Sequence, residues 1–334
     1  MPLTQEPAET VTTPETHRFG RRAMGSPLSL TVVAPSGRAA AERAWQLVSD
    51  EFEVAEQAMS RFRDSSDLTL LNRAAGSGSP IEVDRRLVQA LVAAGRAGRL
   101  TEGRFDARVL ADLERLGYHG IDLGPNAGPA ADPGADRASD GSHRWLCADS
   151  RASTVAIDRP VDLGGIGKGL TLRWAWRLME RSGVLADGGG ALLDAGGDLV
   201  AGGPAPQGGP WIIDIEDPTG GPVPVAVVAV SDGAVATSSV MVNHWTAIDG
   251  RQVHHLVDPR TGEPGGAGLL SVTVAGPDPA WAEVWSKSLF LYGADGISPV
   301  ARARGLAGWW VRDDGRLEMT AAARARTIWV ASEA

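Results

Sequence analysis

The residues from His254 to Pro264 place an imidazole, a carboxylate and a guanidinium around a tight turn, in the order His-His-Leu-Val-Asp-Pro-Arg-Thr-Gly-Glu-Pro. Imidazole has the side-chain pKa nearest neutrality, so a histidine beside an aspartate held by Asp-Pro turn chemistry can act as a general base. The same residues equally suit a solvated bend that the aspartate caps. This stretch alone does not distinguish catalysis from a bend.

A second stretch whose residues could bind a ligand runs from Asp162 to Thr171 and reads Asp-Leu-Gly-Gly-Ile-Gly-Lys-Gly-Leu-Thr. Its glycines would let backbone amides approach a phosphate, and a helix beginning there would favour negative charge. The phosphate-loop pattern of NTPases does not fit, because Gly169 stands where Ser or Thr must follow the lysine. The alternative is a tight strand-to-helix connection with a surface lysine.

Composition limits the function classes. The 334 residues are 43% hydrophobic, enough for a sizeable core. A net charge of −9 argues against a nucleic-acid surface, since phosphate backbones require concentrated positive charge. The single Cys147 excludes an internal disulfide and a cysteine-only metal site. With no long apolar run and no secretory leader pattern, we expect a cytoplasmic protein with no membrane span and no nucleic-acid partner.

The apolar pattern predicts the elements that must position these residues. We expect a disordered tail over residues 1–17, one domain over 18–334 and an exposed loop over 120–143. Helical spacing predicts helices over residues 39–60, 85–101, 167–183 and 279–291. Strands are expected over 28–33, 191–201 with a Gly-Gly bend, 211–216, 224–230, 255–257 and 269–275, with a hairpin over 145–157 and a closing pair at 309–311 and 327–330. The order lacks steady β-α-β alternation, which favours an α+β fold.

Short motifs follow one another along the chain from Met24 to about Gly293. The first half of the series comprises Met24-Gly25-Ser26, Ser60-Arg61-Phe62, Ser66-Asp67-Leu68 with Leu71-Asn72-Arg73, and Gly103-Arg104-Phe105-Asp106. The second half comprises the glycine-rich stretch, Asp194-Ala195-Gly196-Gly197-Asp198, Ala236-Thr237-Ser238-Ser239, and the turn that contains His255 and Asp258. In type and order these motifs resemble those of the FAD:protein FMN transferase family, also called the ApbE family.

The resemblance implies mixed, largely antiparallel sheets flanked by helices, with two lobes around a flavin cleft. It also implies an enzyme that splits the pyrophosphate of FAD, attaches FMN through a phosphoester to a Thr or Ser hydroxyl of an acceptor protein, and releases AMP. We expect His255 to be the base, oriented by Asp258, and Lys168 with the amides around Gly167 and Gly169 to hold phosphate. Further cofactor contacts are expected from Met24, Phe62, Arg104, Phe105, Asp106, Trp174, Thr237, Ser238 and Lys287. For the apolar side chains in this set, core packing is an equally good interpretation.

The resemblance also implies a magnesium ion, bound by Thr171 and by a helix reading Ala-Asp-x-x-(Ala/Asp)-Thr. Here that helix carries Glu283 and Lys287 in place of the usual Asp and Thr. A lysine ammonium has no lone pair and repels a cation, so this sequence departs from the family at the metal. One hypothesis is that Lys287 supplies the positive charge in place of the ion, held by Glu283 one turn away. The other is an ordinary surface ion pair between these two residues.

Three classes of function therefore remain open from the sequence. The first is transfer of FMN to an acceptor protein in the cytoplasm, since no lipoprotein cysteine precedes the domain. The second is an FAD pyrophosphatase that releases FMN and AMP. The third is a flavin-binding protein without turnover.

Overall fold

The computed structural model describes residues 15–118, 145–247 and 249–331. The loop expected at 120–143 and most of the expected tail lie outside these residues. The helices are α1 (Arg38–Met59), α2 (Asp67–Arg73), α3 (Arg85–Leu100), the 3-10 turn η1 (Ala107–Val109), α4 (Leu110–Arg115), α5 (Gly167–Ser182), α6 (Pro279–Phe290), α7 (Gly293–Ala303) and α8 (Ala321–Arg324).

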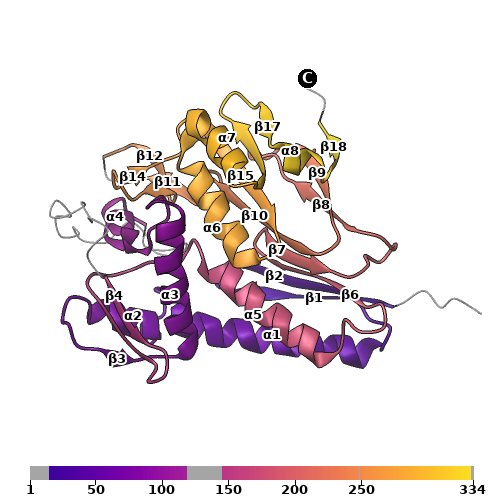
Figure 1. The fold of residues 1–334 in the computed structure, drawn as a ribbon, viewed down its shortest axis with the longest axis horizontal. Helices are drawn as coiled ribbons and strands as arrows, with labels where there is room; N and C mark the ends of the chain where they lie inside the picture. Colours follow the sequence, from indigo (N-terminus) through magenta and orange to yellow (C-terminus); the bar gives the residue numbers. More distant parts are fainter. Residues whose placement is uncertain (1–14, 119–144, 248, 332–334) are drawn as a thin grey trace, which may run out of the picture.

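One large sheet combines strands from both halves of the chain, in the order β1-β2-β6-β7-β10-β15-β16-β17 (Figure 1). Every neighbouring pair in this sheet is antiparallel. Its strands are β1 (Thr16–Ala23), β2 (Ser26–Val33), β6 (Gly190–Ala195), β7 (Asp198–Gly202), β10 (Gly233–Ser239), β15 (Leu269–Gly276), β16 (Ala307–Arg312) and β17 (Leu317–Met319).

Helices α1, α5 and α6 lie across one face of this sheet (Figure 1). The N-terminus of α6 is fixed by Asp278, whose carboxylate accepts a hydrogen bond from the amide of Trp281 at 3.1 Å, and by Pro279 in its first turn. Helix α5 ends at Gly183, whose φ of 77° suits a residue without a β-carbon. Both helices therefore begin or end where the sequence places a cap.

A three-stranded sheet packs on the opposite face of the large sheet. It has the order β18-β9-β8, with β8 (Trp211–Ile215), β9 (Ala226–Val230) and β18 (Thr327–Val330). Side chains along a strand alternate between faces, so Val200 of β7 meets the helices while its neighbours Leu199 and Ala201 meet the small sheet. The middle strands of the large sheet, such as β7, are therefore buried on both faces.

A third group of elements surrounds the end of α1 and the beginnings of α5 and α6. It consists of α2, α3 and a sheet of order β3-β5-β4, formed by β3 (Ile81–Glu82), β4 (Leu146–Asp149) and β5 (Thr154–Ile157). Short strand pairs β11 (His244–Thr246) with β12 (Gln252–His254) and β13 (Val257–Asp258) with β14 (Glu263–Pro264) carry the histidine turn. Phe105 and Leu163 from the predicted motifs are part of this third core.

The predicted α+β fold with largely antiparallel sheets flanked by helices is confirmed. The four predicted helices are present within a residue or two of their expected ends, and residues 145–157 do form a hairpin. Thr16 and His17 lie in β1, ahead of the boundary expected at residue 18. In the described residues no helix is both long and apolar enough to cross a bilayer.

Three strand predictions were wrong. Residues 191–201 form two paired strands rather than one bent strand, because Gly196 and Gly197 both take positive φ and turn the chain back. The strand expected at 255–257 is interrupted, since His255 and Leu256 separate β12 from β13. The closing strands do not pair with each other: β16 joins the large sheet and β18 pairs with β9.

Candidate active site

The glycine-rich loop meets α6 where α5 begins. A β-carbon on Gly169 would lie 2.6 Å from the Cα of Ala280 and from the carbonyl oxygen of Pro279, so only glycine permits this crossing of the two helices. The amide of Gly169 donates to Oε2 of Glu283 at 2.8 Å, and the amide of Gly167 donates to the carbonyl oxygen of Leu163 at 2.8 Å. These two amides, predicted to hold phosphate, are thus bonded within the protein.

Lys168 points from the start of α5 to the start of β7, where its ammonium forms an ion pair with Oδ2 of Asp198. The other oxygen of this carboxylate accepts a hydrogen bond from the amide of Thr237 at 3.3 Å. Burial alone would lower the pKa of Lys168, but the carboxylates of Asp198 and Glu283 raise it. Lys168 therefore stays protonated, as expected of a phosphate-binding lysine. It is paired with Asp198, which differs from the surface lysine considered as the alternative.

His255 is held through its ring. Its Nδ1 atom lies 3.3 Å from the carbonyl oxygen of Asn243. A carbonyl can only accept, so Nδ1 carries the hydrogen and Nε2 keeps its lone pair. Burial, and then the charge of Lys287, lower the pKa of His255 to about 3. The imidazole is consequently neutral, with Nε2 available to take a proton.

Asp258 was predicted to orient His255, and it makes different contacts. In the described residues no hydrogen bond joins the two side chains. The Asp258 carboxylate instead accepts from the amide of Arg260 at 3.0 Å and pairs with the guanidinium groups of Arg260 at 2.7 Å and Arg104 at 3.3 Å. Burial would raise the pKa of Asp258, but these arginines lower it. Asp258 shapes the turn and fixes Arg104, and Asn243 orients the histidine.

A buried ion pair and an aromatic cluster extend to His255 through Tyr118, and of their members the sequence analysis selected only Phe62 as a site residue. Nε of Arg61 lies 2.6 Å from Oδ2 of Asp162, with side chains only 8% and 10% exposed. The guanidinium of Arg61 covers the rings of Phe62 and Tyr118 at 4.2 and 4.9 Å from their centroids. Tyr118 stacks on Trp245 at 5.0 Å and tilts toward His255 at 6.4 Å. Arg61 and Asp162 belong to quoted motifs, whereas Tyr118 and Trp245 stand in no recognisable pattern.

The predicted ring-binding residues differ in their surroundings. Phe105 is buried in the third core, which favours core packing for this residue. Trp174 is partly buried and packs against the same core. Met24 is partly buried beside Gly167 and takes a positive φ of 49°, with its amide bonded to Glu56 at 3.0 Å. Phe62 is 55% exposed and offers a free ring face at the aromatic cluster.

Most of the other polar residues predicted to contact the cofactor form hydrogen bonds or ion pairs with protein groups. Arg104 donates to the carbonyl oxygen of Leu291 at 2.7 Å, and Asp106 pairs with Arg108 at 2.7 Å. Ser238 is buried with its hydroxyl 2.9 Å from that of Ser286, while Thr237 is exposed on the neighbouring position of β10. Of this set, Thr237 is the residue whose side chain faces solvent.

The residues expected to bind magnesium do not form a ligand set. Thr171 is fully buried and its hydroxyl donates to the carbonyl oxygen of Gly167 at 2.8 Å. Glu283 uses one oxygen for the Gly169 amide, and burial raises its pKa to about 8 with help from Asp198. Across the described residues no cluster of three His, Cys, Asp or Glu side chains could hold a metal ion. Mg²⁺ prefers octahedral oxygen ligands, and this donor set does not fit it.

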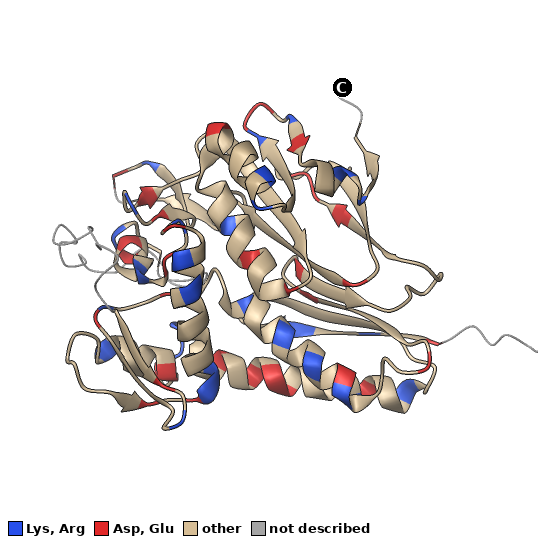
Figure 2. Ribbon diagram, viewed as in Figure 1, with Lys and Arg blue, Asp and Glu red and all other residues tan. Residues whose placement is uncertain are grey.

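Glu283 and Lys287 are the charged residues of α6, which is otherwise apolar or small (Figure 2). Their exposed fractions are 5% and 8%, so the surface ion pair considered from the sequence is wrong. The hypothesis that Glu283 holds Lys287 is also wrong, because the described residues show no ion pair or hydrogen bond between them. Burial lowers the pKa of Lys287, and the carboxylates of Asp162 and Glu283 oppose that effect.

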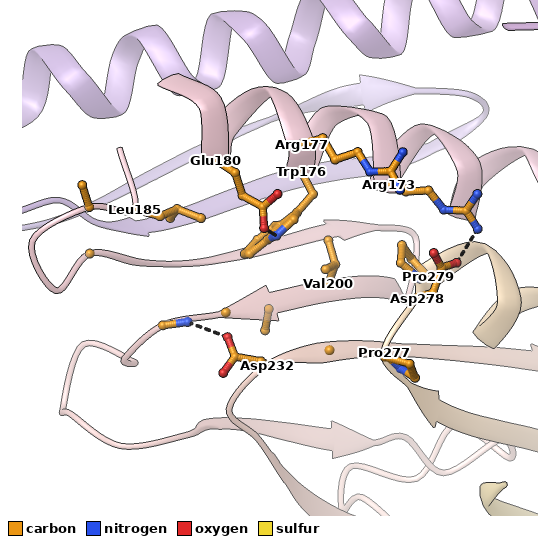
Figure 3. Close-up of a pocket in the computed structure, with 16 residues that line it drawn as sticks. Arg173, Trp176, Arg177, Glu180, Leu185, Val200, Asp232, Pro277, Asp278 and Pro279 are labelled. Carbon is orange, nitrogen blue, oxygen red and sulfur yellow. Dashed lines mark hydrogen bonds and ion pairs between the residues drawn. The ribbon is translucent and has the colours of Figure 1, made fainter. Parts of the chain in front are cut away.

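A separate groove of about 680 Å³ lies between α5 and the turns at the ends of β6, β7 and β10 (Figure 3). Arg173, Trp176, Glu180 and Asp278 line it together with several glycines and prolines. Arg173 pairs with Asp278, and the indole of Trp176 donates to Glu180 at 2.9 Å. None of the predicted site residues lines this groove, so it is distinct from the candidate active site.

Comparisons with known proteins bear on the family and on the fold. The sequence model of the ApbE family matches residues 24–310. The FAD:protein FMN transferase of Salmonella typhimurium is 28% identical over 317 residues, which are 93% of this chain and 88% of the relative. The ApbE protein of Thermotoga maritima has a TM-score of 0.80 at 23% identity, over 93% of this chain and 99% of that one. The flavin transferase ApbE of Vibrio cholerae has a TM-score of 0.76 at 24% identity, over 94% and 99%. These two structures share the fold.

Proposed function

The chain belongs to the ApbE family, and we propose that it transfers FMN from FAD to a Thr or Ser hydroxyl of an acceptor protein and releases AMP. The relative in Salmonella typhimurium bears the name of this activity. The observation that carries the proposal is the neutral imidazole of His255, whose Nε2 is free and whose charge state responds to Lys287 and Lys168. A base next to two ammonium groups suits proton removal beside a bound polyphosphate.

The proposed reaction is a displacement at phosphorus. The acceptor hydroxyl oxygen forms a bond to the phosphorus of the FMN half, and the bond from that phosphorus to the bridging oxygen breaks. Nε2 of His255 takes the hydroxyl proton, and AMP leaves with the bridging oxygen. The ammonium groups of Lys168 and Lys287 stabilise the negative charge on the phosphoryl oxygens and on AMP.

The low pKa of His255 belongs to the protein without a ligand. Burial is the largest cause of that low pKa, and the positive charges of Lys287 and Lys168 add to it by disfavouring an imidazolium. A bound pyrophosphate offsets the two charges but not the burial, so the pKa of His255 rises when FAD is present. The imidazole therefore becomes a stronger base in the complex with the substrate.

The proposal also includes the other residues that the sequence predicted to contact FAD. The exposed ring of Phe62, with Tyr118 beneath Arg61, offers a flat surface on which the isoalloxazine or adenine ring can stack. Met24, Thr237 and Arg104 lie on segments around this site, whereas Phe105, Asp106, Trp174 and Ser238 act through packing and hydrogen bonds.

The test is detection of the protein-bound product. The purified protein is incubated with FAD and a lysate of its source cells. Covalently bound flavin is then detected by in-gel fluorescence under denaturing conditions. Mass spectrometry should place an added FMN on a Thr or Ser, with AMP appearing in equal amount. FMN and AMP without any labelled protein would identify an FAD pyrophosphatase, and binding without either product a flavin-binding protein.

A further inference from the structure

We propose that Lys287 is the built-in cation for the pyrophosphate of FAD, so that this protein binds and uses FAD without a divalent metal ion. This inference rests on the proposed function, because it names the group that meets the substrate at the same site. It concerns a position at which this chain differs from the pattern expected of its family.

The first observation is that Lys287 has no protein partner. The other basic side chains around the loop are already paired: Lys168 with Asp198, Arg61 with Asp162, and Arg104 with Asp258. Lys287 is 8% exposed, and in the described part of the chain its ammonium makes no hydrogen bond and no ion pair. The carboxylates of Asp162 and Glu283 act on this ammonium electrostatically but do not contact it. A largely buried lysine with no anion in contact indicates that an anion from outside the chain completes the site.

The second observation is that the glycine-rich loop makes room for this side chain. A β-carbon on Gly165 would lie 2.7 Å from Cδ and 3.2 Å from Nζ of Lys287, and 3.0 Å from the ring of Phe105. The ammonium therefore lies against the backbone of the same loop that carries Lys168. Two lysines approach this loop, one from α5 and one from α6.

The third observation is that the neighbouring carboxylate makes no direct contact with Lys287. Glu283 accepts the Gly169 amide with Oε2, while its Oε1 is buried without a hydrogen-bond partner among the described residues. Among the described residues no hydrogen bond and no ion pair joins Glu283 to Lys287, because the carboxylate is turned toward the Gly169 amide. The positive charge of Lys287 is thereby left for the ligand.

The chemistry of the two cations explains the replacement. A magnesium ion requires several oxygen ligands, whereas an ammonium supplies three hydrogen-bond donors and no ligand. Lys287 can donate to non-bridging phosphate oxygens and stabilise the charge that develops on AMP, without water exchange or a metal. The same ammonium repels a divalent ion from Glu283.

The test is the affinity for FAD, measured by quenching of flavin fluorescence in EDTA and again in magnesium chloride. The native protein should bind FAD equally in both. Lys287→Met should weaken FAD binding about tenfold or more, the order expected for a lost charge-assisted hydrogen bond. Binding of riboflavin, which has no phosphate, should be unchanged in the same variant, and this control separates a lost phosphate contact from a damaged fold.

A second variant is designed to gain a dependence on magnesium. Glu283→Asp combined with Lys287→Thr restores the expected carboxylate and hydroxyl, and FAD binding by this double variant should improve on addition of magnesium. The proposal is overturned if native FAD binding requires magnesium, if FAD does not bind at all, or if Lys287→Met binds FAD like the native protein. Metal-free FAD binding without transfer to any protein would retract the transferase function and leave the role of Lys287 standing.

Discussion

The Nδ1 atom of His255 lies 3.3 Å from the carbonyl oxygen of Asn243, twelve residues earlier in the chain. A backbone carbonyl cannot be changed by a side-chain substitution, so this contact fixes the tautomer of His255 in any variant that keeps the loop. Nε2 is therefore the nitrogen that keeps its lone pair, and the proposed mechanism assigns the proton to it. The proposed base depends on loop geometry rather than on a second titratable group.

Replacing His255 with Ala should lower the rate of flavin transfer by about 10²- to 10⁴-fold, the contribution typical of a general base. The fold should persist, because the lost contact is a single hydrogen bond to Asn243. The matched control is His244→Ala, which removes an exposed histidine whose Nδ1 also meets a carbonyl, that of Met241 at 3.1 Å. Rates are compared by in-gel flavin fluorescence, and an unimpaired His255→Ala would remove this residue from the mechanism.

The pH dependence of stability should change when His255 is replaced with Asn. The pKa of His255 is about 3 in the folded protein and near 6.5 in the unfolded chain. The folded state therefore binds the proton less well, so this stabilising contribution is complete above pH 6.5 and is lost as the pH falls toward 3. Relative to the variant, the native protein should lose up to about 1 kcal/mol of unfolding free energy for each pH unit in that window. Urea unfolding from pH 7 to 4 measures this, and parallel curves would contradict it.

The Lys168 and Asp198 pair should show strong coupling. Lys168→Met leaves the buried Asp198 carboxylate without its cation, at a cost of about 3 kcal/mol. Adding Asp198→Asn removes the unpaired charge, so the double variant should recover much of that loss. A double-mutant cycle of unfolding free energies measures the coupling, and strictly additive costs would show that the two groups do not depend on each other.

Gly165→Ala should displace Lys287. The new methyl group would come within 2.7 Å of Cδ of Lys287, and overpacking of this kind costs about 1 to 3 kcal/mol. Adding Lys287→Ala should relieve part of that cost because the crowded side chain is gone. Gly276→Ala is the control, since nothing lies within 4 Å of a β-carbon there. Thermal unfolding of the four proteins tests this, and a Gly165→Ala protein as stable as the Gly276→Ala control would contradict the close approach.

The sequence was sufficient for the parts of this fold that depend on local pattern. The apolar periodicity of α1, α3, α5 and α6 reflects the sheet or core that each helix covers, and Gly183 marks the end of α5. The Gly196-Gly197 pair also signalled a change of direction. Periodicity does not tell a bend from a reversal, however, and only the pairing of β6 with β7 does so.

Contacts between distant segments could not be predicted. Asp258 had a histidine three residues away, but Arg104 reaches it from 154 residues earlier and competes for the same carboxylate. The orienting group of His255 is a backbone carbonyl, which every residue possesses and which leaves no mark in the sequence. Glu283 and Lys287 have the spacing of a surface pair, yet α6 is buried, so Glu283 meets the amide of Gly169 instead.

The strand order of the large sheet also governs when the protein can fold during its synthesis. Strand β2 pairs with β1 on one side and with β6, which begins at Gly190, on the other. Until β6 emerges from the ribosome, β2 has an open edge and its apolar residues Leu28, Leu30 and Val32 have no neighbouring strand there. Such long-range pairing slows folding and exposes a strand edge to aggregation. His255 and Lys287 emerge later still, so FAD cannot assist the early steps, and we expect the nascent chain to depend on chaperones until α6 is complete.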